Sequence, residues 1–211
     1  NIDPEILRYL IASTKPKKAI TFDAGMSLVE LADEYERLLS RDLESEMRDE
    51  GLSRRQRVAI EDAEGALRMS RIGDSTSAKV SFRHLAMLAQ VKNDQEIVQS
   101  LGDGISDKLA RMRNWINGAH FPSELRISVR KEKMAGIDES ISKGLSQSLA
   151  DCEWNTKAIA EAISSCFKNN GISPKEGYRN LYLAILGVEK GPRLAPILSE
   201  LERTRVLELL G

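Results

Sequence analysis

Apolar residues return every three or four positions along most of this 211-residue sequence. Ile105, Leu109, Met112 and Ile116 follow one another at intervals of four, three and four, which places their side chains on one face of a helix. Further stripes of this kind lie in residues 6–11, 28–39, 82–89, 137–149, 159–167 and 194–201. Residues 125–129 alternate like a short strand, but one such run cannot form a sheet. The spacing therefore predicts an all-α fold, a helical bundle.

The composition agrees with this fold class and suggests two helical subdomains. Only 5% of the residues are aromatic and 30% are charged, which suits amphipathic helices better than a β-sandwich. A chain of this length with 41% apolar residues can bury one large core or two small ones. A highly charged stretch begins at Arg41, and two helical units meet near Trp154. We therefore expect a leader over 1–50, a first helical subdomain over 51–151 and a C-terminal helical subdomain over 152–211.

Several helix ends can be predicted from local signals. Asp3 followed by Pro4 is typical of an N-cap and a first helical position, and residues 173–176 combine a serine cap, a proline and a capping-box acid. Residues 169–171 and Gly187 are expected to end helices. Because the sequence opens with Asn1 and runs straight into a helix start, we expect it to be a piece excised from a longer protein.

No residue pattern for catalysis, a metal or a cofactor is found. The sequence lacks a glycine-rich phosphate loop, a Walker lysine and a nucleophile elbow. The histidines, His84 and His120, have no Cys or carboxylate at ligand spacing, and Cys152 and Cys166 are too far apart for a metal pair. We expect no catalytic residue, no metal and no cofactor here, and a reduced, cytoplasmic protein. With no apolar run of about 18 residues, we expect no membrane partner.

Positive charge is concentrated locally although the net charge is only -1. Residues 108–133 hold seven Lys and Arg against two Glu, and basic side chains supply most of the affinity for RNA phosphates. Arg111 and Trp115 lie four residues apart on one helix flank, where they could stack unpaired bases. Alternatively, Trp115 borders the core and Arg111 covers its ring in a cation–π contact.

Other basic side chains are also candidates for RNA contact. Arg83 and His84 follow a predicted cap at Ser81, and the first turn of a helix has free N–H groups that can hold phosphate. Core packing explains His84 equally well. Lys15, Lys17 and Lys18 occupy a turn that could be simply solvated, as could the arginines of residues 54–57. The candidate RNA-binding residues are Arg83, His84, Arg111, Arg113, Trp115, Lys15, Lys17 and Lys18.

Separated segments, in the same order along the chain, resemble the class I lysyl-tRNA synthetases. The similar segments are residues 4–18, 22–25, 28–35, 82–85, 110–115, 182–187 and 191–194. Residues 44–81 and 132–151 match that family only in character. The last two segments also resemble glutamyl-tRNA synthetases and do not separate the two families.

The resemblance implies a stem-contact leader followed by an α-helix cage that binds the anticodon region of lysine tRNA. It also implies that ATP and lysine chemistry takes place in an N-terminal catalytic domain outside these residues, since both ATP-binding signatures of class I synthetases are absent. The whole protein is then an ATP-dependent lysine–tRNA ligase of protein synthesis, and this part is non-catalytic. The alternatives are a helical scaffold that docks on protein, or the equivalent domain of a glutamyl-tRNA synthetase.

Overall fold

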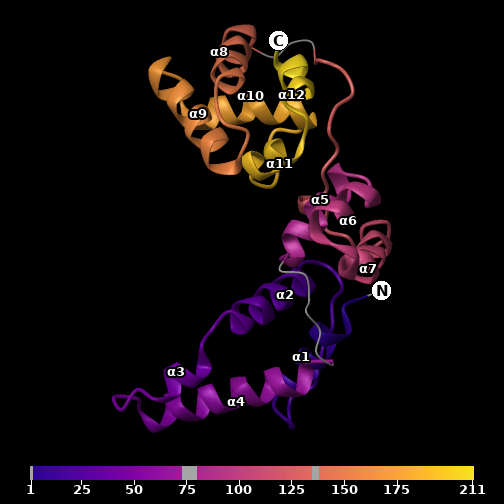
Figure 1. The fold of residues 1–211 in the computed structure, drawn as a ribbon, viewed down its shortest axis with the longest axis vertical. Helices are drawn as coiled ribbons and strands as arrows, with labels where there is room; N and C mark the ends of the chain where they lie inside the picture. The colour runs from indigo at the N-terminus through magenta and orange to yellow at the C-terminus, as the bar shows by residue number, and fades with distance from the viewer. Residues whose placement is uncertain (1, 73–79, 135–137) are drawn as a thin grey trace. The chain divides into compact units, whose positions relative to one another are not determined.

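The computed structural model describes residues 2–72, 80–134 and 138–211, which form α-helices and two short 3₁₀-helices without a β-strand (Figure 1). The helices are α1 (Pro4–Ser13), α2 (Met26–Leu39), α3 (Leu43–Met47), α4 (Arg54–Ser70), α5 (Phe82–Val91), α6 (Asp94–Leu101), α7 (Ser106–Ile116), α8 (Glu139–Ala150), α9 (Thr156–Asn169), α10 (Pro174–Leu186), α11 (Leu194–Glu200) and α12 (Arg203–Leu210). The 3₁₀-helices are η1 (Asp103–Ile105) and η2 (Ser123–Leu125). The predicted all-α fold is confirmed.

Residues 125–129, whose alternation resembles a short strand, do not form one. Leu125 ends η2, and the residues after it have no regular secondary structure. Their backbone is held by bonds to helices instead. Ile127 N–H donates to the Gln90 side-chain oxygen over 2.8 Å, and Arg130 N–H donates to the Ile185 carbonyl over 2.9 Å.

The described residues divide into two compact units. Unit 1 contains the chain up to residue 89 together with residues 94–122, and unit 2 contains residues 90–93 and 123–211. This is a division by packing. The functional division into a leader over 1–50 and subdomains over 51–151 and 152–211 stays a prediction.

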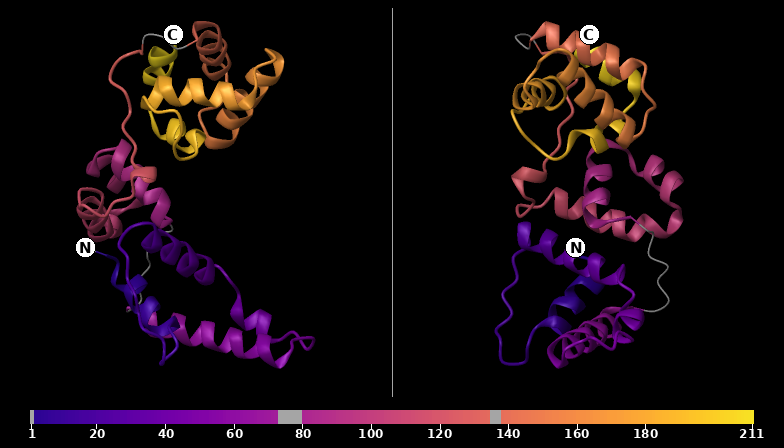
Figure 2. Two further views of the ribbon diagram at one scale, coloured as in Figure 1. Left: turned by 180° about the vertical axis from the view of Figure 1, so that it is seen from behind. Right: turned by 90° about the vertical axis from the view of Figure 1, so that its left-hand side faces the viewer.

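In unit 1, α1 packs along α4, as the views in Figure 2 also show. The predicted cap of α1 is present, because the Asp3 carboxylate accepts the Glu5 N–H over 3.0 Å. Arg8 donates to the Met69 carbonyl over 3.0 Å, and Glu5 accepts the Ile72 N–H over 3.1 Å. The later residue of α1 thus pairs with the earlier of the two residues at the end of α4, and the earlier residue pairs with the later one. The two helices are therefore antiparallel.

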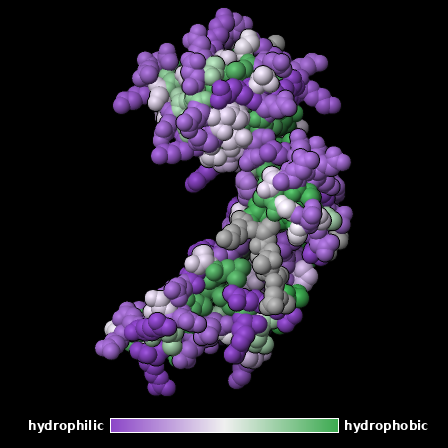
Figure 3. All heavy atoms as spheres, viewed as in Figure 1, coloured by the Kyte–Doolittle hydropathy of each residue, from purple (hydrophilic) through white to green (hydrophobic). Residues whose placement is uncertain are grey.

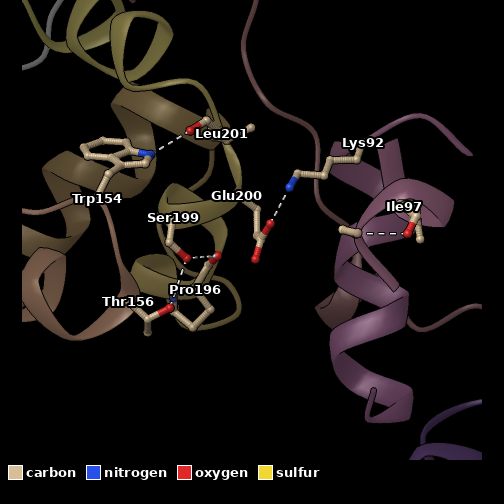
Figure 4. A network of polar contacts seen from close by, with 9 residues as sticks. Lys92, Ile97, Trp154, Thr156, Pro196, Ser199, Glu200 and Leu201 are labelled. Carbon is tan, nitrogen blue, oxygen red and sulfur yellow. Dashed lines mark hydrogen bonds and ion pairs between the residues drawn. The ribbon is translucent and has the colours of Figure 1, made fainter. Parts of the chain in front are cut away.

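In unit 2, helices α8 to α12 surround a core of aliphatic side chains with almost no exposed area. The predicted helix ends are found: Ser173 Oγ accepts the Glu176 N–H over 3.3 Å, while Gly171 and Gly187 have the positive φ that favours glycine. Figure 4 shows further links to α11: Trp154 Nε1 donates to the Leu201 carbonyl over 2.8 Å, and Lys92 pairs with Glu200 over 2.5 Å.

Within the described ranges, none of the helices combines the length and apolar character needed to cross a lipid bilayer.

Candidate nucleic-acid interface

The first turn of α5 carries two of the predicted RNA contacts, and its N–H groups already have partners. Ser81 caps the helix as predicted, because its Oγ accepts the His84 N–H over 3.2 Å. The Phe82 N–H donates to the Glu36 carboxylate over 2.5 Å. A phosphate therefore has no free N–H group at these two positions.

Arg83 is exposed but pairs with a carboxylate of α2. Its Nε lies 2.7 Å from Asp33 Oδ2, with 44% and 30% of the two side chains exposed. Together with the Phe82–Glu36 bond, this ion pair ties α5 to the acidic face of α2. His84 is half-buried in the same turn.

Burial raises the pKa of Glu36 above its ordinary value, although the Phe82 N–H, the next largest influence, lowers it. The negative charge of Asp33 raises it further, whereas Lys108 and Arg83 lower it. Glu36 thus meets both signs of charge in a partly desolvated position.

Arg113 links α7 to the helices before it. Its guanidinium donates to Asp94 Oδ1 from Nε over 2.9 Å and from Nη2 over 2.6 Å. Nη1 donates to the Ala89 carbonyl at the same time. In this conformation the donors of Arg113 that point inward are engaged within the protein.

Trp115 lies in the core of unit 1, with 6% of its surface exposed. Its Nε1 donates to the Ala24 carbonyl over 2.7 Å, and its ring centroid lies 5.1 Å from that of Phe82 and 4.9 Å from that of Phe121. The side chain borders the core, as one of the two interpretations expected. The cation–π contact that this interpretation also expected between Arg111 and Trp115 is not found among the described residues.

Arg111 differs from the two arginines above, because no hydrogen bond or ion pair to its side chain is found within the described residues. Its Nε is buried and has no hydrogen-bond partner there. Of the three arginines predicted to contact RNA, Arg111 is the one for which the described residues provide no partner.

The three lysines predicted to touch RNA, Lys15, Lys17 and Lys18, lie in the turn after α1 and are exposed. Lys18 N–H donates to the Lys15 carbonyl over 2.9 Å, which fixes the turn. On the same unit, Arg54 and Arg55 are exposed at the start of α4. Among the described residues none of these five side chains pairs with a carboxylate, so they are available to phosphates.

The basic segment 108–133 is divided between the two units at residue 122. In unit 1, Lys108 pairs with Asp3 over 3.3 Å. In unit 2, Arg130 donates to the Glu132 carbonyl over 3.2 Å and Lys133 to the Gly211 carbonyl over 2.7 Å. Several basic side chains that made this segment a candidate therefore bond to groups of the protein itself.

Comparison with known proteins identifies relatives for almost the whole chain. No protein-family model matches the sequence. The lysine–tRNA ligase of Thermoplasma volcanium is 25% identical over 226 aligned positions, which cover 99% of this chain and 42% of the relative. The lysine–tRNA ligases of Pyrococcus horikoshii and Methanocaldococcus jannaschii are 24% and 26% identical, each over 233 positions.

The chain is homologous to part of the lysine–tRNA ligases. The resemblance stated from the separated sequence segments is thereby confirmed. The chain spans only about two fifths of the length of these ligases. The match therefore does not show that this chain has the activity of the whole enzyme.

The sequence analysis missed one contact between an arginine and a tryptophan. Arg203 lies over the Trp154 ring, with its Cζ 5.1 Å from the ring centroid, and also donates to the Ala150 and Cys152 carbonyls over 3.2 and 2.6 Å. The two residues are 49 positions apart, so no local spacing could reveal the pair. These bonds indicate a structural role in unit 2.

Proposed function

We propose that this chain is the C-terminal, anticodon-binding region of a class I lysine–tRNA ligase. It holds lysine tRNA while a separate N-terminal domain uses ATP to attach lysine. The match to lysine–tRNA ligases over 99% of the chain carries the proposal. ATP belongs to that catalytic domain, which is also the partner of this region, and a protein with this role in protein synthesis acts in the cytoplasm.

The all-helical architecture supports the proposal in two ways. Arg83 and Arg113 pair with Asp33 and Asp94, so they link α5 to α2 and α7 to the start of α6 within unit 1. The exposed turn with Lys15, Lys17 and Lys18 offers positive charge to the phosphate backbone. Phosphate contacts position the tRNA, and unpaired bases provide the specificity.

Binding of tRNA to the 211-residue chain tests this function. We expect lysine tRNA with its own anticodon to bind at least about tenfold more tightly than the same tRNA with an altered anticodon. Each missing base contact costs ~1–3 kcal/mol. Affinity should fall steeply between about 50 and about 200 mM salt. Equal binding of the two tRNAs, or no effect of salt, contradicts the proposal. Glutamate tRNA in the same titration tests the glutamyl-type alternative.

The three lysines of the turn provide a matched pair of variants. Replacing Lys15, Lys17 and Lys18 with alanine should weaken binding and lower the salt dependence in proportion to the number of phosphates that are no longer neutralised. Replacing the same three with arginine keeps the charge and should preserve binding. If both triple variants bind like the unmodified chain, this turn is not part of the interface.

The internal pairing of Arg83, Arg113 and Lys108 favours a second candidate function, a helical scaffold that docks on a protein. A chain that binds no tRNA in the titration but retains its fold would support that function.

A further inference from the structure

Unit 1 contains a pocket to which the proposed function assigns no role. Its volume is 530 Å³, within the range of pockets that bind small molecules. Helices α1, α2, α5 and α7 form its walls, with Tyr35, Phe82, Met112 and Trp115 among the lining residues. Figure 3 shows apolar side chains reaching the surface in the region of α2.

Arg111 is one of the residues lining this pocket, and its Nε is buried without a partner among the described residues. Buried polar groups in folded proteins are almost always hydrogen-bonded, so an unpaired donor needs an explanation. Arginine offers five N–H donors in a fixed plane. Because Arg111 lines the pocket and has no described partner, its guanidinium can donate to an acceptor on a molecule bound there.

The other charges around the pocket restrict the chemistry of that molecule. Asp3, Glu5 and Glu36 also line it, against Lys108 and Arg111. Lys108 is already paired with Asp3. A phosphate group would meet these carboxylates and be repelled. A neutral group with both acceptors and donors on its edge fits the mixture of guanidinium and carboxylate better.

An unpaired nucleobase has these properties. It is planar and uncharged, its faces pack on aromatic and aliphatic side chains, and its edge carries donors and acceptors together. Arginine bonding to a base edge is a common specific contact with nucleic acids.

We propose that the pocket between α1, α2, α5 and α7 takes one unpaired base of the bound RNA, with Arg111 donating to an acceptor on the base edge. The proposal rests on the proposed function in that the base comes from tRNA. It goes beyond that function in naming a pocket in unit 1 and one arginine as determinants of specificity.

Free nucleosides test the pocket separately from tRNA binding. Trp115 and Trp154 are the two tryptophans of the chain, so their indole N–H signals are readily distinguished by NMR. Adenosine, guanosine, cytidine and uridine are each added at millimolar concentration. We expect at least one to shift the Trp115 signal and leave that of Trp154 unchanged, because Trp115 lines the pocket and Trp154 belongs to unit 2.

Arg111→Met should abolish this shift. Arg68→Met removes the same charge from an exposed site of the same unit and should not affect it. A well-dispersed amide spectrum of the unliganded variant establishes that it is folded. A shift that persists in Arg111→Met, or one seen with nucleoside monophosphates but not with nucleosides, contradicts base recognition by Arg111.

A coupling experiment with tRNA identifies the base. Lysine tRNA transcripts that lack one unpaired base in turn are titrated against the unmodified chain and Arg111→Met. We expect one abasic position and Arg111→Met each to weaken binding about tenfold or more, with no further loss when they are combined.

The outcomes separate the two proposals. If nucleosides bind at the pocket and tRNA does not bind, the proposed function fails and the pocket stands. If tRNA binds but no nucleoside shifts Trp115 and no abasic position couples to Arg111, the pocket proposal is overturned and the function stands. Failure of both arms overturns both.

Discussion

Arg83, Arg111 and Arg113 are the same residue type in three different environments. Arg83 is paired with Asp33, and Arg113 is paired with Asp94 and a backbone carbonyl. Arg111 has a buried donor without a partner in the described part of the chain. Positive charge alone therefore does not distinguish arginines that stabilise the fold from an arginine available to a ligand.

Substituting the arginines of α7 should separate these roles. Arg113→Met leaves Asp94 and the Ala89 carbonyl without this donor, so we expect the free energy of unfolding to fall by ~1–3 kcal/mol. Arg111→Met removes no described hydrogen bond and should change stability by less than about 0.5 kcal/mol. Urea denaturation of both variants measures the difference. Equal losses of stability would mean that Arg111 has a structural role that its surroundings do not show.

The raised pKa of Glu36 gives a pH dependence with a definite sign. The folded state holds this proton more tightly than the unfolded state, so the stabilising contribution is complete below the unfolded pKa and is lost as pH rises through the raised folded pKa. Glu36→Gln does not titrate at this site. The stability of Glu36→Gln relative to the unmodified chain should therefore increase from about pH 4 to about pH 7. Urea denaturation across this range checks it, and a constant or shrinking difference contradicts it.

At the scale of the elements, two glycines inside helices differ in the space around them: one is closely packed and the other is not. A Cβ on Gly177 in α10 would overlap the Phe167 ring of α9, whereas a Cβ on Gly65 in α4 would meet none of the described residues within 4 Å. Gly177 thus permits the close approach of α9 and α10. Gly65 has no packing reason to be glycine.

The two glycine-to-alanine variants should shift stability in opposite directions. Gly177→Ala forces the buried Phe167 ring to move and should cost ~1–3 kcal/mol. Gly65→Ala should stabilise by ~0.5–1 kcal/mol, because alanine restricts the unfolded chain. Chemical denaturation measures both. Stabilisation by Gly177→Ala would show that α9 and α10 are not packed as described.

Features set by neighbouring residues were predictable from the sequence. The cap at Asp3, the cap at Ser81 and the stop at Gly187 each depend on side chains or backbone within a few positions. The helical stripes were predictable for the same reason. The alternation at residues 125–129 does not produce a strand, because no partner strand is present among the described residues.

Partners distant in the sequence were not predictable. Arg83 donates to Asp33, which is 50 residues away in the sequence, and Trp115 donates to the Ala24 carbonyl, which is 91 residues away. Such pairings depend on which helix faces pack together. The structure therefore reduces the number of predicted RNA contacts. Arg111 and the three lysines of the turn after α1 are those with no side-chain partner among the described residues.

At the scale of the whole molecule, two compact helical units contain much internally paired charge, and the chain matches lysine–tRNA ligases over nearly its whole length. A tRNA-binding region needs a stable scaffold and a limited number of available donors. Under the proposed function, ion pairs between helices provide the first, and exposed lysines provide the second.

The most direct test of this account is a footprint of the chain on lysine tRNA by hydroxyl-radical cleavage. Saturating amounts of the 211-residue chain should protect the backbone of the anticodon loop and its stem, since this region is proposed to bind the anticodon arm. Protection limited to the acceptor stem, or a cleavage pattern identical to that of free tRNA, would contradict the account.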